Sequence, residues 1–126
     1  MTIWILWGIV LAMAVWMGYN YLRIRRAAKI VDNAEFEALI RKGQLIDVRD
    51  AAEFHRKHIL GARNIPSSQL KSSLAALRKD KPVLLYENQR GQRVTNTALY
   101  LKKQGFSEIY ILSYGLDSWI GKVKTS

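Results

Sequence analysis

Residues 83–93 read VLLYENQRGQR and combine three features that predict one site. The run from Val83 to Tyr86 is continuously apolar, which is typical of a strand buried on both faces of a parallel sheet. A polar loop with a glycine and two arginines follows, and a helix is predicted from Arg93 to Gln104. In open α/β sheets, ligands bind beyond the carboxyl ends of strands, where backbone N–H groups at a helix start attract anions. We therefore expect an anion-binding loop here.

On both sides of this loop, short apolar runs alternate with helical patterns. Asp32 and Glu35 have the spacing of a capping box ahead of an apolar helical repeat. Further helices are predicted over residues 51–56, between residues 67 and 81, and over residues 116–120. Strands are predicted over residues 44–48, within residues 59–65 and over residues 109–112. This alternation predicts an α/β domain over residues 32–126, with a parallel sheet covered by helices on both faces as three α/β/α layers.

The N-terminal segment has a different composition. Residues 1–22 contain no Lys, Arg, Asp or Glu, and the apolar run from Ile3 to Leu22 has the length that crosses a hydrocarbon core as a helix. Its large aromatic side chains cluster toward the two ends, as at membrane interfaces: Trp4, Trp7, Trp16, Tyr19 and Tyr21. A cleaved signal peptide usually starts with basic residues, which are absent, and a helix buried in a soluble domain is rarely apolar all round. The sequence predicts a retained transmembrane helix over residues 1–22.

The chain carries 20 basic and 10 acidic residues, and all of this charge lies after residue 22. A basic linker is predicted over residues 23–31, with Arg23, Arg25, Arg26 and Lys29. Basic flanks stay on the cytoplasmic side, so we expect a single-pass protein of the cell membrane with its N-terminus outside and its domain in the cytoplasm. The remaining basic residues are scattered, which favours solvated faces near an anionic leaflet over a nucleic-acid-binding surface. The expected partners are the membrane and a protein, without nucleic acid.

Two motifs carry a resemblance to a known family. Residues 45–50 (LIDVRD) with Glu53 and Phe54, followed by residues 57–66 (KHILGARNIP), resemble the paired motifs of the rhodanese homology domain. Lys57 replaces a glycine of the family pattern and Leu60 a proline. Residues 101–106 (LKKQGF) and 112–119 (LSYGLDSW) are similar to the helix after the family's active loop and to its closing motif. The resemblance covers residues 31–123 and implies the rhodanese-like α/β/α fold.

The resemblance also implies a chemistry. Active members are thiosulfate sulfurtransferases, in which a loop cysteine carries sulfur as a persulfide held by backbone N–H groups and a loop arginine. Related phosphatases share the fold, with a loop one residue longer. The present chain has no cysteine. Counting from the strand places Glu87 at the cysteine position, whereas counting back from Gly91 and Arg93 places Asn88 there.

The candidate site is this loop, without a catalytic residue: Glu87, Asn88, Gln89, Arg90, Gly91, Gln92 and Arg93. The resemblance implies that Asp47, Arg49 and His58 form the pocket rim. The alternative is a buried or partly buried ion pair for Asp47 and Arg49, and a structural role for His58. We expect the Glu87 carboxylate to occupy the anion nest from within, the alternative being that it is a solvated loop residue. No metal site is predicted, because His55 and His58 lack a third ligand, and no cofactor is expected.

The sequence thus predicts a membrane-anchored rhodanese-like domain that lacks catalytic activity and acts as a binding or regulatory module on the cytoplasmic face. The alternative is a sulfurtransferase or phosphatase-like enzyme that works with a cysteine of a partner. A third possibility is a mainly structural membrane protein.

Overall fold

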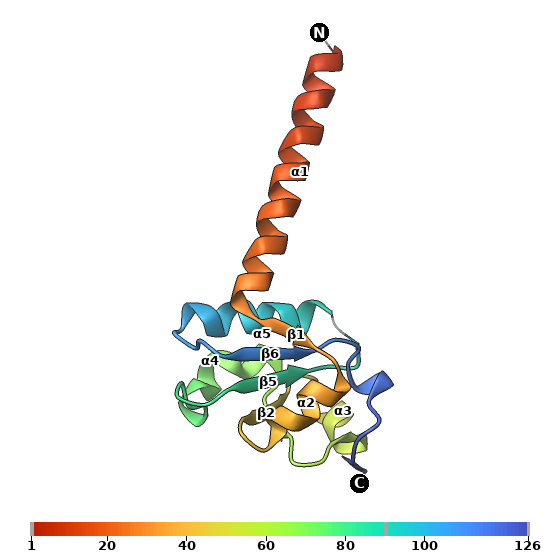
Figure 1. Ribbon diagram of the computed structural model, residues 1–126, viewed down its shortest axis with the longest axis vertical. Coiled ribbons are helices and arrows are strands. Elements are labelled where there is room, and N and C mark those ends of the chain that lie inside the picture. Colours follow the sequence, from red (N-terminus) through yellow and green to blue (C-terminus); the bar gives the residue numbers. More distant parts are fainter. Residues whose placement is uncertain (1, 90, 126) are drawn as a thin grey trace.

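A computed structural model of the chain describes residues 2–89 and 91–125, and the side chains of all of these except residues 23–27. A long N-terminal helix, α1 (Thr2–Ala27), leaves one end of an α/β domain, and the C-terminus lies at the opposite end (Figure 1). The elements of the domain follow in chain order: β1 (Lys29–Val31), α2 (Asn33–Ile40), β2 (Gln44–Asp47), α3 (Ala51–Arg56), β3 (His58–Ile59), β4 (Arg63–Asn64), the 3-10 helix η1 (Ser67–Gln69), α4 (Leu70–Ser73), the 3-10 helix η2 (Leu74–Ala76), β5 (Val83–Tyr86), α5 (Gln92–Lys103), β6 (Ile109–Leu112), the 3-10 helix η3 (Leu116–Ser118) and β7 (Val123–Lys124).

Five parallel strands form the main sheet in the order β1-β6-β5-β2-β4, and β3 pairs with β7 in a separate antiparallel ribbon. The central strand β5 is completely buried, as its continuous apolar run predicts. The register pairs Asp47 of β2 with Tyr86 of β5, so both strands end at the same edge of the sheet. The loops that follow these two residues are therefore neighbours.

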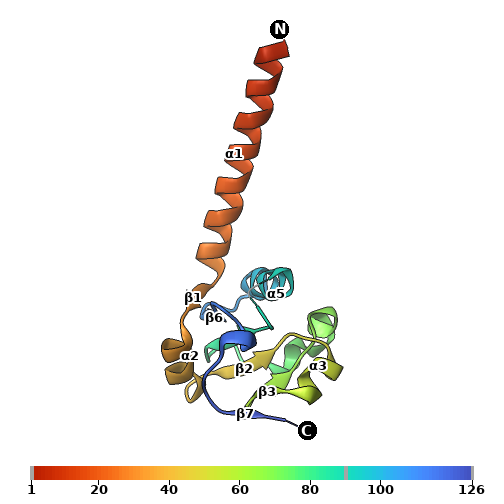
Figure 2. The same cartoon turned by 90° about the vertical axis from the view of Figure 1, so that its right-hand side faces the viewer.

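Helices cover both faces of this sheet (Figure 2). On one face, Leu85 packs with Val94 and Leu101 of α5. On the other face, Leu84 packs with Phe36 of α2. Successive side chains of β5 thus enter opposite apolar clusters, because side chains alternate along a strand. The predicted three-layer α/β/α fold with a parallel sheet is confirmed.

Helix α1 is long and apolar enough to cross a membrane. Its stretch from Thr2 to Leu22 has a mean hydropathy of 1.7, and none of that apolar surface is buried against the domain. At 1.5 Å per residue these 21 residues span about 31 Å, close to the thickness of a hydrocarbon core.

The structure corrects two sequence predictions. Residues 23–31 are not a linker, because α1 continues to Ala27 and Lys29–Val31 pairs in parallel with β6. The segment from Leu22 to Ala27 contains no helix breaker, and arginine and alanine both favour helix. The helix predicted between residues 67 and 81 is divided into η1, α4 and η2. Within it the Ser72 hydroxyl donates to the carbonyl of Gln69, a local bond of the kind that competes with regular helix.

Candidate functional site

The loop after β5 is fixed against the chain that follows β6. The N–H of Leu116 donates to the carbonyl of Glu87 at 2.8 Å, and the N–H of Asp117 donates to the carbonyl of Asn88 at 3.0 Å. This close approach requires Gly115, where φ is +70° and a Cβ would lie 2.3 Å from the Asn88 carbonyl oxygen. Only glycine satisfies both constraints without strain. The loop backbone is thus held by η3 as well as by its own strand.

The side chain of Glu87 points into the turn at which α5 begins. Its Oε2 accepts hydrogen bonds from the N–H groups of Val94 at 2.8 Å and Gly91 at 3.2 Å, and its Oε1 accepts one from Nε of Arg93 at 3.2 Å. The residue is only 7% exposed. Since Gly91 is the N-cap of α5, the carboxylate caps the helix, and its negative charge interacts favourably with the positive end of the helix dipole. The carboxylate of Glu87 therefore satisfies these donors at the start of α5, where the sequence predicts an anion nest.

Glu53 of α3 continues this charge network. Its Oε1 lies 3.4 Å from Nη1 of Arg93, and its Oε2 accepts a hydrogen bond from Nδ2 of Asn88 at 2.9 Å. Burial alone would raise the pKa of Glu53, but the hydrogen bonds from Arg93 and Asn88 outweigh it and lower that pKa. Burial likewise opposes the charge of Arg93, yet the two glutamates keep its pKa above the ordinary value. The site is therefore a set of paired charges.

Asp47 and Arg49 form the buried ion pair that the sequence predicts. Asp47 is completely buried and Arg49 is 3% exposed. Nη2 of Arg49 lies 2.7 Å from Oδ2 of Asp47, and its Nε donates to both carboxylate oxygens. Nη1 of Arg49 donates to Oδ1 of Asn88 at 2.8 Å, which connects this pair to the loop. Burial would lower the pKa of Arg49, but the hydrogen bonds that its guanidinium donates to Asp47, together with the negative charge of Asp47, raise that pKa.

An open cleft of about 270 Å³ lies beside the loop. Basic, acidic and apolar side chains from four segments line it: Arg49, Glu53, Arg56, Lys57, Asn88, Leu116 and Asp117. Asp47 lies beneath Arg49 and does not line the cleft. His58 does not line it either, because its ring stacks on Phe54 at 3.8 Å and its Nδ1 lies 2.8 Å from the Phe54 carbonyl oxygen. These contacts with Phe54 are those of a structural histidine, and the place of His58 at the rim stays a prediction.

The other loop residues have lesser roles. Gln89 donates to the carboxylate of Asp117 at 3.3 Å, and Gln92 donates to Asn96 within α5. Arg90, which the sequence also places in the site, lies outside the described residues. Within residues 2–89 and 91–125, no three His, Asp or Glu side chains converge as a metal site.

Sequence reasoning missed Glu53, Arg56, Lys57 and the pair Leu116–Asp117 as lining residues. Glu53 stands inside the first rhodanese motif, four residues after Arg49, so its carboxylate was an available signal. Leu116 and Asp117 come from the far end of the chain and reach the cleft only through the Gly115 turn. Both stand inside the closing motif at residues 112–119, but that motif gives no sign that they line a cleft.

Comparison with known proteins shows to which family this chain belongs. The Rhodanese-like domain family matches residues 32–122, which is most of the chain. The chain belongs to the rhodanese-like domain family. A relative of this rhodanese-like protein is the uncharacterized protein YqhL of Bacillus subtilis (strain 168), which is 47% identical over 113 residues, covering 90% of the present chain and 89% of YqhL. The thiosulfate sulfurtransferase GlpE of Stutzerimonas stutzeri (strain A1501) is 36% identical over 75 residues, covering 60% of the present chain and 68% of GlpE.

Solved structures show the same fold. A rhodanese-related protein from Thermoplasma volcanium has a TM-score of 0.70 at 25% identity, covering 78% of the present chain and 99% of its own. A full-length protein from Lactobacillus plantarum has a TM-score of 0.68 at 24% identity, covering 91% and 98% respectively. The present rhodanese-like domain has no cysteine anywhere, which is consistent with an inactive module.

Proposed function

We propose that this chain is a membrane-anchored rhodanese-like domain without sulfurtransferase activity, which binds a protein partner on the cytoplasmic face of the membrane. The observation that carries the proposal is the Glu87 carboxylate, which accepts hydrogen bonds from three donors at the start of α5. Persulfide transfer requires a thiolate that acts first as nucleophile and then as leaving group. A glutamate carboxylate has no sulfur to carry, and the chain supplies no other thiol.

A protein is favoured over a small anion as the ligand. An external oxyanion would have to displace a carboxylate that is tethered to the same loop and is therefore present at a high effective concentration. The cleft beside the loop instead offers exposed charges of both signs: Arg56 and Lys57 are basic, and Asp117 is acidic. Charges at the rim of an interface steer association and select complementary partners.

The anchor in this proposal is α1. Its span from Thr2 to Leu22 contains no charged residue, and Arg23, Arg25 and Arg26 follow directly. This arrangement supports an orientation in which the N-terminus faces outward and the domain lies in the cytoplasm. A regulatory role follows from the same assignment, because a domain that binds without turnover acts by holding its partner at the membrane.

The activity part of the proposal is tested with a thiosulfate:cyanide sulfurtransferase assay on the purified full-length chain. We expect no turnover above the buffer rate. Turnover by the cysteine-free chain would refute the non-catalytic assignment. Glu87→Cys provides the matched gain-of-function test, and formation of a persulfide on it would show that Glu87 stands at the family's cysteine position.

The binding part is tested by photo-crosslinking in intact membranes, with a photoreactive amino acid at position 117 in place of Asp117. We expect one discrete protein adduct that is lost in the double variant Arg56→Glu, Lys57→Glu. The matched control reverses the adjacent exposed pair Arg41 and Lys42, which does not line the cleft, and retains the adduct. An adduct that both double variants lose equally would show attraction by net charge alone and would contradict binding at the cleft.

A further inference from the structure

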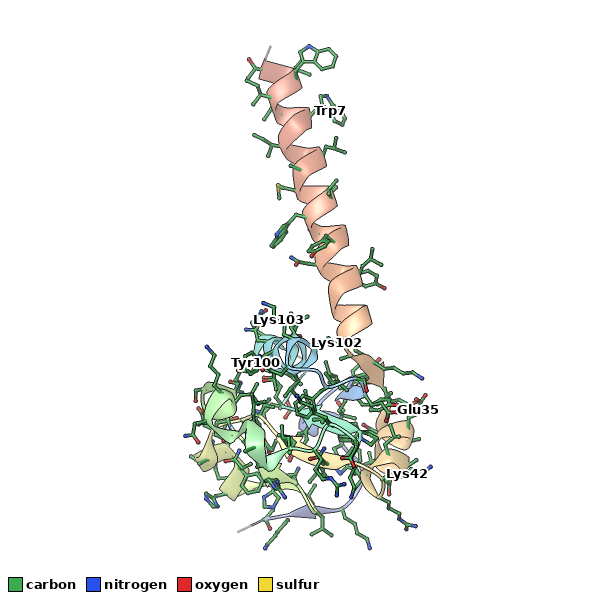
Figure 3. The ribbon with its side chains drawn as sticks, turned by 90° about the vertical axis from the view of Figure 1, so that its left-hand side faces the viewer. Trp7, Glu35, Lys42, Tyr100, Lys102 and Lys103 are labelled. Atoms are coloured by element: carbon green, nitrogen blue, oxygen red, sulfur yellow. The ribbon has the colours of Figure 1, made fainter. Side chains whose placement is uncertain are left out.

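Helix α5 lies on the side of the domain from which α1 leaves. Two views at right angles place α5 next to the domain end of α1, while the C-terminus and β7 lie at the opposite end (Figures 1 and 2). The two helices are in contact. Lys102 and Lys103 lie at this α1-facing end of the domain, whereas Lys42 lies farther from α1 (Figure 3). Of the described elements outside α1, α5 is therefore well placed to meet a membrane that α1 crosses.

The surface of α5 is divided into a buried and an exposed side. Val94, Ala98 and Leu101 are buried against the sheet. The opposite side, which we call the outer face of α5, carries four exposed residues and one half-buried leucine: Gln92, Asn96, Leu99, Lys102 and Lys103. This face joins two cations and one apolar side chain, a combination suited to lipid head groups and their glycerol region.

The charged side chains of helices α1 and α5 are all basic. Neither α1 nor α5 contains an aspartate or glutamate. Within residues 2–89 and 91–125, no carboxylate lies within ion-pair distance of Lys102 or Lys103. Lys71 adds a further cation beside α5, with its Nζ 6.0 Å from the centre of the Tyr100 ring. The acidic residue nearest in sequence is the exposed Glu108, five residues after Lys103, and Glu35 lies on α2 (Figure 3). An anionic surface beside α5 would therefore meet helices that carry only basic charges.

The distance along α1 brings this face close to such a surface. The apolar span ends at Leu22 and the helix continues to Ala27, a rise of about 7.5 Å over five residues. The Debye length at physiological ionic strength is about 8 Å, so charges this near a leaflet are attracted to it in spite of salt. The sequence places three arginines within the same turn and a half of helix.

We propose that the outer face of α5 docks on anionic lipid head groups of the leaflet from which α1 emerges. This inference rests on the proposed membrane anchor and goes beyond it, because an anchor alone leaves the domain free to rotate. Strands β5 and β6 run across the direction of α1 (Figure 1), so docking holds the carboxyl edge of the sheet sideways, along the plane of the membrane. The cleft is then presented to a partner that lies on the same membrane.

The absence of native cysteine makes a single-label experiment direct. The full-length chain with Asn96→Cys carries a nitroxide on the outer face, and Thr125→Cys carries one at the opposite end of the domain. Each is placed in nanodiscs of phosphatidylcholine, with or without phosphatidylglycerol. We expect the label at position 96 to be shielded from a water-soluble nickel chelate only in anionic discs, and the label at position 125 to stay accessible in both.

Charge reversal supplies the matched comparison. In the Asn96→Cys background, Lys102→Glu with Lys103→Glu should reduce the docked-to-undocked ratio by about 25-fold or more, since each basic group near an anionic leaflet favours docking by about five-fold. Lys122→Glu with Lys124→Glu makes the same change in net charge at the far end and should leave the shielding intact. All four lysines are exposed, so both variants should keep the unfolding midpoint of the parent.

Equal shielding in neutral and anionic discs, or equal loss of shielding in the two reversal variants, would overturn the docking inference. Retention of the chain in the discs after an alkaline wash reports on the anchor separately. If the chain is lost in that wash, the membrane anchor and the docking inference are both overturned. If it is retained without shielding at position 96, only the docking inference falls.

Discussion

Replacing Glu87 with alanine tests whether its carboxylate fills the nest. The change removes the acceptor of hydrogen bonds from Gly91 N–H, Val94 N–H and the Arg93 guanidinium. Loss of a helix cap costs about 1 kcal/mol, and loss of a charged hydrogen bond about 1.5–3 kcal/mol. Because the side chain is only 7% exposed, these donors are poorly solvated once it is gone. We expect the free energy of unfolding to fall by about 2–4 kcal/mol.

The same variant should gain a response to anions. With the carboxylate removed, the two N–H groups and Arg93 face a space that a sulfate or thiosulfate oxygen can enter. An anion that binds only the folded state at ten times its dissociation constant stabilises that state by about 1.4 kcal/mol. The parent chain should gain none of this, since Glu87 already occupies the donors.

The free energy of unfolding is measured by pulse proteolysis in urea, on the full-length chain in nanodiscs, with and without thiosulfate and at constant ionic strength. Glu37→Ala removes an exposed glutamate of α2 and should stay within about 0.5 kcal/mol of the parent. The reasoning fails if Glu87→Ala is no more destabilising than this control. It fails equally if thiosulfate stabilises the parent as much as the variant.

Three further predictions concern the residues around the loop. Gly115→Ala should lower the free energy of unfolding in urea by more than about 2 kcal/mol, because its Cβ would lie 2.3 Å from a backbone oxygen. The control Gly61→Ala, at a φ of +90° with open space around it, should cost only about 1–2 kcal/mol. Similar losses in the two variants would contradict the close approach at Gly115. Asp47→Asn should lower the free energy of unfolding by about 3–5 kcal/mol, because it leaves the buried guanidinium of Arg49 without its counter-charge. A decrease below about 1 kcal/mol would show that the ion pair is solvated. The pKa of Glu53 is lowered in the folded state from its ordinary value of 4.5, so its contribution to folding stability is complete above pH 4.5 and is lost as the pH falls through the lower folded-state pKa. The difference in unfolding free energy between the parent and Glu53→Gln should therefore shrink on acidification. A difference that grows would refute the lowered pKa.

Local patterns were sufficient where one segment carries the whole signal. The apolar run of β5 predicted a central buried strand, and the spacing of Asp32 and Glu35 predicted a helix start at which the Asp32 side chain accepts from the Glu35 N–H at 2.9 Å. The segment from residue 23 to residue 31 was misjudged because strand β1 exists only through its pairing with β6. A three-residue strand has too little sequence of its own to be recognised.

The sequence alone determined three features of this protein: the lack of cysteine, a polar loop after a buried strand, and an apolar helix ahead of the domain. Each feature can be read without knowing the fold, because the residue types and their order within one segment are enough to predict a strand, a loop or an apolar helix. Only the tertiary structure decided that Glu87 turns inward onto α5 while Asn88 joins Arg49 to Glu53, across 39 and 35 residues of chain. Those contacts depend on the register of β2 against β5 and on the turn at Gly115, and hydrogen bonds between distant segments form only after the sheet has brought the segments together.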